Sequence, residues 1–190
     1  MERKRQATGL GESSRSCEEH KAWLAVWGAE LPSKVKVHVW RLIENGLAVG
    51  KELKYRKIKD NVVCLVCNRE ESLFHRFWSC PHSIAAWKTL GEITGVSFDM
   101  PPRETETHDA LKSWILKWIV SKDTDLVSWF MQMIYNLWSA RNDARDSKRI
   151  EDPCAVARKT TAPVEEWLNL REAQPEPMAK PVERWLKPAA

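Results

Sequence analysis

The chain has 190 residues, of which 30 are Lys or Arg and 26 are Asp or Glu, and its formal charge is +4 with neutral histidines. Apolar residues make up 43% of it, and a chain of this length can bury about two thirds of the surface that its unfolded form exposes. This composition excludes disorder throughout and favours one domain or two small ones.

The sequence contains no apolar run of the roughly 18 residues that a membrane span needs, and its first residues are charged. We therefore expect neither a membrane span nor a secretory signal. Five cysteines, at 17, 64, 67, 80 and 154, are an odd number for a disulfide framework. They indicate a reducing, intracellular environment, without distinguishing nucleus from cytoplasm.

Apolar residues recur at helical spacing along most of the chain, after a polar start over 1–16 that is expected to be disordered. The spacing predicts helices over 18–29, 47–58, 81–95, 110–120, 124–148 and 153–170. It also predicts a helix that Ser33 can cap, with apolar residues from Val35 to Ile43, before the end signal Asn45-Gly46. Alternation at Val35, Val37 and Val39 leaves a strand open as the alternative there. Residues 97–107 are predicted to form a loop, and the Pro-rich residues 171–190 an extended linker-like tail.

One cluster of residues carries chemistry. It has the form CxxC, seven residues, His, four residues, Cys, and consists of Cys64, Cys67, His75 and Cys80. A structural Zn2+ takes four tetrahedral sulfur or nitrogen ligands, and a short CxxC turn lets two thiolates reach one ion. Pro81 favours an extended Cys80 and suits the first position of the following helix. The spacing therefore predicts a structural zinc site with all four positions filled.

Three alternatives to this ligand set stay open at this stage. The cysteines could be small buried side chains beside an incidental histidine, and His82 could replace His75 as the nitrogen ligand. A redox CxxC is disfavoured because no βαβ pattern surrounds it. Cys17 and Cys154 have no partner in the sequence pattern.

Positive charge gathers immediately before the cluster. Residues 31–60 hold eight basic and three acidic residues, whereas 81–128 hold five basic and seven acidic ones. The basic residues are Lys34, Lys36, Arg41, Lys51, Lys54, Arg56, Lys57 and Lys59. Such a segment attracts phosphates, so we predict contact with RNA or DNA through these side chains. The alternative is an ordinary solvated helix face.

Aromatic residues near the basic segment have two interpretations. Tyr55, Phe74, Phe77 and Trp78 could stack on bases, or they could belong to the core. The chain holds 11 tryptophans, and the i, i+4 pairs Trp23/Trp27 and Trp114/Trp118 are interpreted as helix-packing residues. No Gly-rich phosphate loop, nucleophile motif or convincing set of metal-binding carboxylates appears, so catalysis is not expected.

A longer pattern connects the basic segment with the cluster. It comprises Trp27, Leu31-Pro32-Ser33-Lys34-Val35-Lys36, Val39-Trp40-Arg41, Leu47, Leu53, Arg56, Cys64, Cys67, Glu71, His75, Cys80 and Trp87. On these residues, the segment from Cys17 to Leu90 resembles the reverse-transcriptase zinc-binding domain of plant non-LTR retrotransposons. The resemblance implies that the three cysteines and His75 are zinc ligands. His38 replaces an aromatic residue of that family, and Ala48-Val49 replaces a frequent Pro-Thr, which implies diverged packing.

Two further segments carry a related resemblance. Leu137-Trp138-Ser139-Ala140-Arg141-Asn142 resembles a helix that lies between the zinc domain and a ribonuclease H domain, and Arg184-Trp185-Leu186-Lys187-Pro188 resembles the linker before that nuclease. Neither polymerase aspartates nor nuclease carboxylates are present. The resemblance therefore implies a stand-alone remnant of a retroelement reading frame.

The sequence thus predicts a mainly α protein, a small helical domain organised around one structural zinc (CCHC) with a helical C-terminal extension. The expected parts are a disordered lead over 1–16, the zinc-binding domain over 17–95, the extension over 107–170 and the tail over 171–190. The predicted function is non-catalytic binding of Zn2+ and of RNA or DNA in support of reverse transcription. The alternatives are a zinc-folded protein-interaction module and a remnant without selected function.

Overall fold

Helices make up nearly all the regular structure of this computed structural model, which describes residues 9–58, 60 and 63–173. The α-helices are α1 (Gly9–Gly28), α2 (Ser33–Ile43), α3 (Gly50–Tyr55), α4 (Pro81–Thr94), α5 (His108–Ser121), α6 (Thr124–Ser147) and α7 (Pro153–Ala173). A π-helical turn, η1 (His75–Ser79), and a 3-10 turn, η2 (Arg103–Glu106), complete the elements. No strand occurs within those ranges, and the predicted mainly helical class is confirmed.

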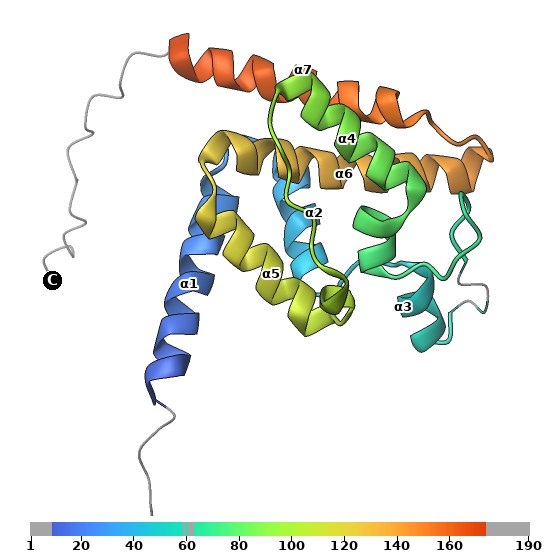
Figure 1. Cartoon of the computed structure of the whole chain (residues 1–190), viewed down its shortest axis with the longest axis horizontal. Coiled ribbons are helices and arrows are strands. Elements are labelled where there is room, and N and C mark those ends of the chain that lie inside the picture. The colour runs from blue at the N-terminus through green and yellow to red at the C-terminus, as the bar shows by residue number, and fades with distance from the viewer. Residues whose placement is uncertain (1–8, 59, 61–62, 174–190) are drawn as a thin grey trace, which may run out of the picture.

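The long helix α6 lies at the centre of the arrangement (Figure 1). It packs against α7 on one side and α2 on another, while α4 packs against α7 and α5 against α1. In Figure 1, α7 lies above α6, α4 slopes down from α7 and overlaps α6 in this view, and α3 lies apart near the short η1 turn. The predicted C-terminal extension is therefore in direct contact with the predicted zinc-binding segment.

A single hydrophobic core joins these helices. Buried apolar side chains run from Ala22 on α1 to Val164 on α7. Aromatic contacts fix its centre, where the ring of Phe130 lies 5.6 Å from that of Trp87 and 4.4 Å from that of Trp118. Stacked or edge-on pairs at such distances add to the stabilisation that burial alone provides.

Helix α1 begins earlier than the sequence predicts. It starts at Gly9 rather than near residue 18, so it includes residues 9–16 of the expected disordered lead, and residues 1–8 lie outside the described residues. Ala22 and Val26 are fully buried and anchor the helix. Once such a nucleus exists, each added residue costs little, and the segment contains no proline to stop propagation.

Helix α2 is confirmed and the strand alternative is wrong. It ends as the Asn45-Gly46 signal predicts, because Asn45 has φ 51° and Gly46 N donates to Arg41 O at 2.6 Å, which closes a Schellman motif. Ser33, however, is the first helical residue and makes no capping hydrogen bond, since Pro32 occupies the N-cap position. The prediction of a Ser33 cap is wrong.

Helix α3 is shorter than the predicted 47–58. Its first turn is held by Glu71, whose carboxylate accepts from Gly50 N at 3.1 Å and whose carbonyl accepts from Lys51 N at 2.9 Å. A second Schellman motif ends it, with Lys57 at φ 55° and Ile58 N bonded to Leu53 O. This second Schellman motif stops the helix before residue 58, where the apolar periodicity predicts its end.

The later elements follow the sequence closely. Pro81 opens α4, Gly95 closes it in the left-handed region at φ 69°, and Asp123 caps α6 through Leu126 N. The predicted loop over 97–107 contains only the η2 turn. Helix α7 continues to residue 173, three residues into the predicted tail, and the rest of that tail lies outside the described residues.

One tryptophan interpretation is wrong. Trp118 is buried and Trp114 stacks on it, but Trp27 is 46% exposed. The buried stripe of α1 runs through Ala22, Val26 and Ala29, and a neighbouring residue is turned about 100° away from it. Within the described part of the chain, no helix combines the length and apolar character needed to cross a membrane.

Candidate metal centre

The first two cysteines lie in a tight turn. Cys64 N donates to Arg69 O at 2.8 Å, and Asn68 N donates to Cys64 O at 2.9 Å. Asn68 adopts φ 57°, a left-handed conformation that asparagine tolerates better than most residues. An isolated antiparallel bridge between Val63 and Glu70 closes the turn behind it. This knuckle directs the side chains of Cys64 and Cys67 to the same side.

The other two cluster residues are placed by the η1 turn. His75 begins it and Cys80 follows its last residue, with Cys80 N bonded to His75 O at 2.9 Å. Cys80 has φ −70° and ψ 135°, the extended conformation predicted for the residue before Pro81. The wider π-helical turn therefore returns Cys80 beneath His75.

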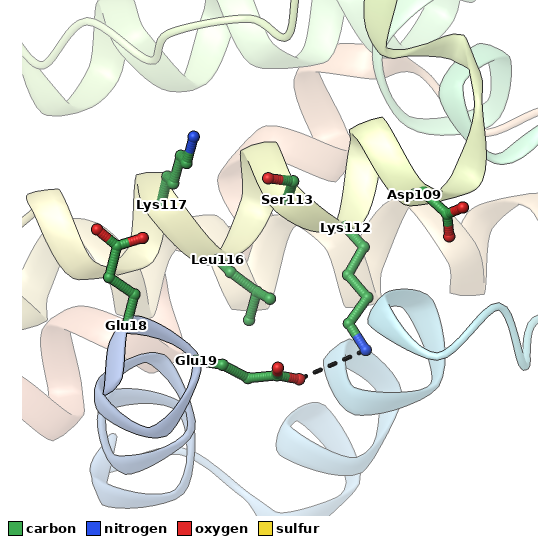
Figure 2. A pocket seen from close by; sticks show the side chains of 7 residues that line it. All are labelled: Glu18, Glu19, Asp109, Lys112, Ser113, Leu116 and Lys117. Atoms are coloured by element: carbon green, nitrogen blue, oxygen red, sulfur yellow. Dashed lines mark ion pairs between the residues drawn. The ribbon is translucent and has the colours of Figure 1, made fainter. Parts of the chain in front are cut away.

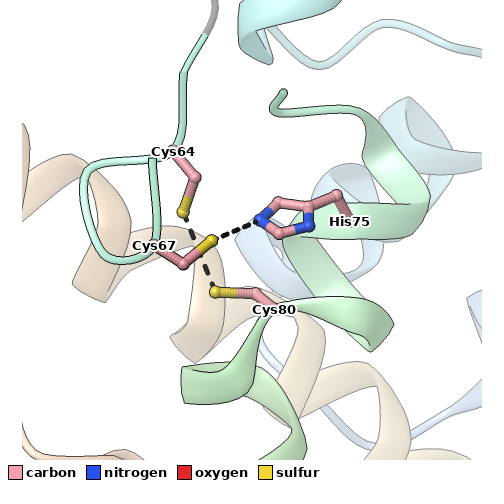
Figure 3. A group of neighbouring side chains, drawn as sticks. All are labelled: Cys64, Cys67, His75 and Cys80. Atoms are coloured by element: carbon pink, nitrogen blue, oxygen red, sulfur yellow. Dashed lines mark hydrogen bonds between the residues drawn. The ribbon is translucent and has the colours of Figure 1, made fainter. Parts of the chain in front are cut away.

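The four side chains converge (Figure 3). Their ligand atoms all lie within 4.8 Å of one another, with Cys64 Sγ 3.8 Å from Cys80 Sγ and Cys67 Sγ 3.2 Å from His75 Nε2. Two sulfurs at tetrahedral corners about 2.3 Å from one metal would lie about 3.8 Å apart. The cluster thus has the ligand types and spacing for one Zn2+.

His82 is not part of this cluster. Its Nε2 lies 2.7 Å from the carbonyl oxygen of Glu151, two residues before α7 begins. His75, in contrast, directs Nε2 towards Cys67 and Nδ1 towards Ser79 Oγ, 3.4 Å away. A hydroxyl or carbonyl beside the second nitrogen is the usual arrangement for a metal-bound histidine. The alternative with His82 as the nitrogen ligand is therefore wrong.

The sulfurs of Cys64 and Cys80 share one hydrogen bond, which shifts their pKa values in opposite directions. The hydrogen bond from Cys80 lowers the pKa of the Cys64 thiol, and the same bond, followed by burial, raises the pKa of Cys80. The shared proton stabilises one thiolate at the expense of the other. A bound zinc ion would remove this asymmetry, because a coordinating thiol is deprotonated outright.

Buried charges surround the cluster. Arg76 is 2% exposed and donates from Nη2 to Leu137 O on α6 at 2.8 Å. Burial lowers its pKa, while Glu71, Cys80 and Cys64 raise it through their negative charge. Zn2+ with three thiolates and one neutral imidazole carries a net charge of −1, which one guanidinium balances.

A second buried charge pair links the cluster to α6. Arg141 Nη2 lies 2.7 Å from Glu71 Oε2, and Arg141 Nε lies 3.1 Å from Oε1. Glu71 and Arg141 both appear in the motifs that carry the resemblance, but sequence reasoning predicted neither this pairing nor a role for Arg76. The spacing of residues in the sequence predicts contacts between near neighbours, not between positions that are 70 residues apart.

The predicted nucleic-acid-binding residues fall on two surfaces. Lys34, Lys36 and Arg41 lie on α2, whereas Lys51, Lys54, Arg56 and Lys57 lie on α3 and the turn after it. Lys36 is partly engaged, since its Nζ donates to Trp27 O at 2.9 Å. Lys59 lies outside the described residues.

The aromatic residues near this segment comprise one exposed residue and three buried ones. Tyr55 is 84% exposed beside the lysines of α3. Phe74, Phe77 and Trp78 are buried, so they are core residues and not available for base stacking.

A groove of about 580 Å³ lies between α1 and α5 (Figure 2). Its lining mixes acidic residues, Glu18, Glu19 and Asp109, with Lys112 and Lys117. Lys112 Nζ lies 3.5 Å from a Glu19 oxygen and 2.8 Å from a Glu44 oxygen, and these contacts raise the pKa of Lys112. The lysine is thus already paired, and the surrounding carboxylates disfavour phosphate.

Comparison with known proteins bears directly on the cluster. Residues 11–87 match the family described as zinc-binding in reverse transcriptase. The four clustered residues all lie inside that match, and the description concerns zinc binding rather than catalysis. No curated protein and no solved structure matches the chain.

The matched zinc-binding region includes α2, α3 and the cluster, whereas α5, α6 and α7 lie beyond it. Together, the match and the cluster support a zinc-binding module of retroelement origin with Zn2+ as its metal. Helix α6 nevertheless completes the surroundings of the cluster, through Leu137 and Arg141.

Proposed function

We propose that this chain is a non-catalytic module, folded by zinc, that contacts RNA or DNA in support of reverse transcription. Its source would be a plant non-LTR retrotransposon, as the longer sequence pattern indicates. The metal would be structural, because four protein ligands leave no open position for water or substrate.

The observation that carries the proposal is the exposed basic surface of α3. Lys51, Lys54, Arg56 and Lys57 are all exposed, and Tyr55 lies among them with 84% of its surface free. Side chains that combine positive charge with an accessible ring can grip a single strand through its phosphates and its bases. Glu71 holds the start of α3 directly beside the zinc knuckle, so the metal would fix the position of this surface.

Gel-shift titrations of the full chain across a range of salt concentrations test the proposal. We expect affinity to fall steeply as salt rises, since each phosphate contact contributes about 0.7 to the logarithmic slope for single strands and about 0.9 for duplexes. Absence of binding at low salt, or affinity that ignores salt, would reject the proposal.

A matched pair of triple variants locates the binding surface. Lys51→Gln, Lys54→Gln and Lys57→Gln together should flatten the salt slope by about 2 for a single strand. The control changes the same charge elsewhere, with Lys88→Gln, Lys117→Gln and Lys159→Gln on α4, α5 and α7. Equal losses from the two triple variants would indicate net charge alone and would argue against a surface on α3.

A second candidate function is protein interaction. It is favoured by Trp27 and Trp40, which remain 46% and 44% exposed on α1 and α2. Exposed aromatic side chains are common at protein interfaces. Pull-downs that use intact and Cys67→Ser protein, and that recover no zinc-dependent partner, would count against this function.

A further inference from the structure

A basic and aromatic groove of about 400 Å³ lies between α2 and α6, apart from the surface on α3. Its lining residues are Lys34, Val37, His38, Arg41, Tyr135, Trp138, Ser139 and Asn142. The volume lies within the range of about 300 to 1,000 Å³ that small-molecule sites have. No acidic side chain is among these lining residues, in contrast to the groove between α1 and α5.

The groove presents cations and aromatic rings together. Lys34 Nζ lies 5.4 Å from the centre of the Tyr135 ring, and Arg41 is a second cation of the lining. Arg141, which is not a lining residue and is paired with Glu71, lies with its Cζ 5.3 Å from the Trp138 ring. Both rings are only partly buried, so part of each remains accessible. Phe77 supports Trp138 from the core side, with ring centres 6.4 Å apart.

His38 gives the groove an unpaired polar atom. The residue is 7% exposed and lines the groove, and its Nε2 has no hydrogen-bond partner in the described part of the chain. The other surroundings of the imidazole are rings, with Tyr135 edge-on at 5.7 Å and Trp138 at 5.6 Å. Leaving a buried nitrogen unpaired is unfavourable, and a ligand that hydrogen-bonds to it would remove that penalty.

Burial, and to a smaller extent Arg41, lowers the pKa of His38 to about 4. The imidazole is therefore neutral at physiological pH, and one of its nitrogens donates while the other accepts. Ser139 and Asn142 add a hydroxyl and an amide to the lining. Neutral groups of this kind suit the edge of a base, which carries both donors and acceptors.

We propose that the groove between α2 and α6 holds one unstacked nucleotide of a single-stranded nucleic acid. The base packs against Tyr135 and Trp138 and hydrogen-bonds to His38, and the phosphate lies near Lys34 and Arg41. This inference rests on the proposed function and names a binding site for it. The four lining residues on α6 lie outside the family match, which ends at residue 87: Tyr135, Trp138, Ser139 and Asn142.

Photocrosslinking of the full, zinc-loaded chain to oligouridine that carries 5-iodouridine tests the position of the base. We expect crosslinked peptides to contain Tyr135 or Trp138. A duplex of the same sequence should crosslink poorly at these positions, because its bases stay stacked on one another. Crosslinks confined to other residues would overturn the inference.

Affinity measurements test the same site independently. Tyr135→Leu should weaken oligouridine binding about tenfold, the size expected when one base loses its stacking partner, whereas Tyr135→Phe should retain affinity. Lys34→Gln should lower the salt slope by about 0.7, whereas Lys88→Gln, on α4 and outside the groove lining, should leave it nearly unchanged. Circular dichroism checks that each variant keeps its helical content.

The outcomes separate this inference from the function on which it rests. If the wild-type chain binds oligouridine but Tyr135→Leu and Lys34→Gln behave as their controls do, the groove is not the site and the proposed function stands. If the wild-type chain binds no nucleic acid, both fail. If uridine monophosphate binds as tightly as oligouridine, the ligand is a free nucleotide and the inferred strand is wrong. Should Tyr135→Leu misfold, the comparison of Lys34→Gln with its lysine control decides whether the groove is the site.

Discussion

Glu71 and Arg141 form a two-point ion pair that joins the zinc knuckle to the middle of the protein. The carboxylate is 2% exposed, and its two oxygens lie 2.7 and 3.1 Å from Arg141 nitrogens. The same carboxylate accepts from Gly50 N at the start of α3. One side chain therefore connects the segment before the metal cluster, the cluster itself and helix α6.

Removing the guanidinium should be costly. Arg141→Met would leave the carboxylate of Glu71 buried without its partner, and loss of one member of a buried pair destabilises proteins by about 3 to 5 kcal/mol. Urea unfolding measures the change. Arg145→Met on the same helix is the control, because Arg145 and Asp146 form an exposed pair, and solvent and salt screen such pairs so that they add little to stability. Equal destabilisation by both variants would contradict the assigned role of Glu71.

The cysteines of the cluster should differ from the cysteines outside it. Cys80→Ser removes one of four ligands, whereas Cys154→Ser alters a half-buried thiol whose sulfur lies 3.6 Å from Thr89 Oγ1. Metal analysis of purified protein should find one zinc per wild-type or Cys154→Ser chain and much less in Cys80→Ser.

The same pair of variants tests whether the metal holds the fold. Zinc binding to small structural sites contributes on the order of 10 kcal/mol to folding. Because α6 and α7 share a core with the cluster segment, loss of zinc should lower the helical signal well beyond residues 64–80. Chelator and Cys80→Ser should have similar effects on circular dichroism, and an unchanged spectrum after chelation would contradict a structural metal.

Local signals in the sequence predict most of the helices and the composition of the cluster. Pro81, Gly95 and Asn45-Gly46 mark helix ends through backbone preferences that act over a few residues, and the structure places them at those ends. The spacing of Cys64, Cys67, His75 and Cys80 works in the same way, because a knuckle and a single wide turn suffice to bring their ligand atoms together.

Contacts between distant segments account for what the sequence does not reveal. Helix α3 starts where Glu71 accepts its first amide hydrogen bonds, 21 residues downstream of Gly50, and no local pattern specifies that position. Trp27 has helical spacing from Trp23, but the partners of α1 cover only the stripe through Ala22 and Val26. The groove between α2 and α6 likewise depends on residues about 100 positions apart, such as His38 and Tyr135.

Arg76 should tune the affinity for zinc. Its guanidinium is buried beside Cys64 and Cys80 and bonds to Leu137 O, so Arg76→Met would leave the −1 charge of the zinc-thiolate centre without a counter-charge. Loss of a group that supports metal ligands typically weakens metal binding about 10- to 100-fold. Competition with a chromophoric chelator measures the affinity. Arg69→Met is the control, since Arg69 is exposed and its guanidinium donates to the carbonyl of Ser79 on the outside of the knuckle. Equal affinity in the two variants would show that the charge of Arg76 does not act on the metal.

His38 should make the fold sensitive to mild acid. Burial and the nearby Arg41 lower its pKa from 6.5 to about 4 in the folded chain. Because the unfolded chain binds this proton more readily, the contribution of His38 to stability is complete above pH 6.5 and is lost as the pH falls towards 4. The difference between the pKa values of His38 in the unfolded and folded chains corresponds to about 3 kcal/mol of unfolding free energy.

The variant His38→Phe isolates this effect from the protonation of the zinc ligands, which both proteins share. Phenylalanine suits the site, because the imidazole already packs among Phe77, Tyr135 and Trp138. Urea unfolding should show that, as the pH falls from 7 to 4, the free energy of unfolding of His38→Phe rises relative to that of the wild-type chain. We expect the gain to reach about 3 kcal/mol. Arg41→Gln should reduce the gain, since it removes the smaller cause of the shift in pKa. Parallel stability curves for the wild-type chain and His38→Phe would mean that the folded and unfolded chains bind this proton equally well.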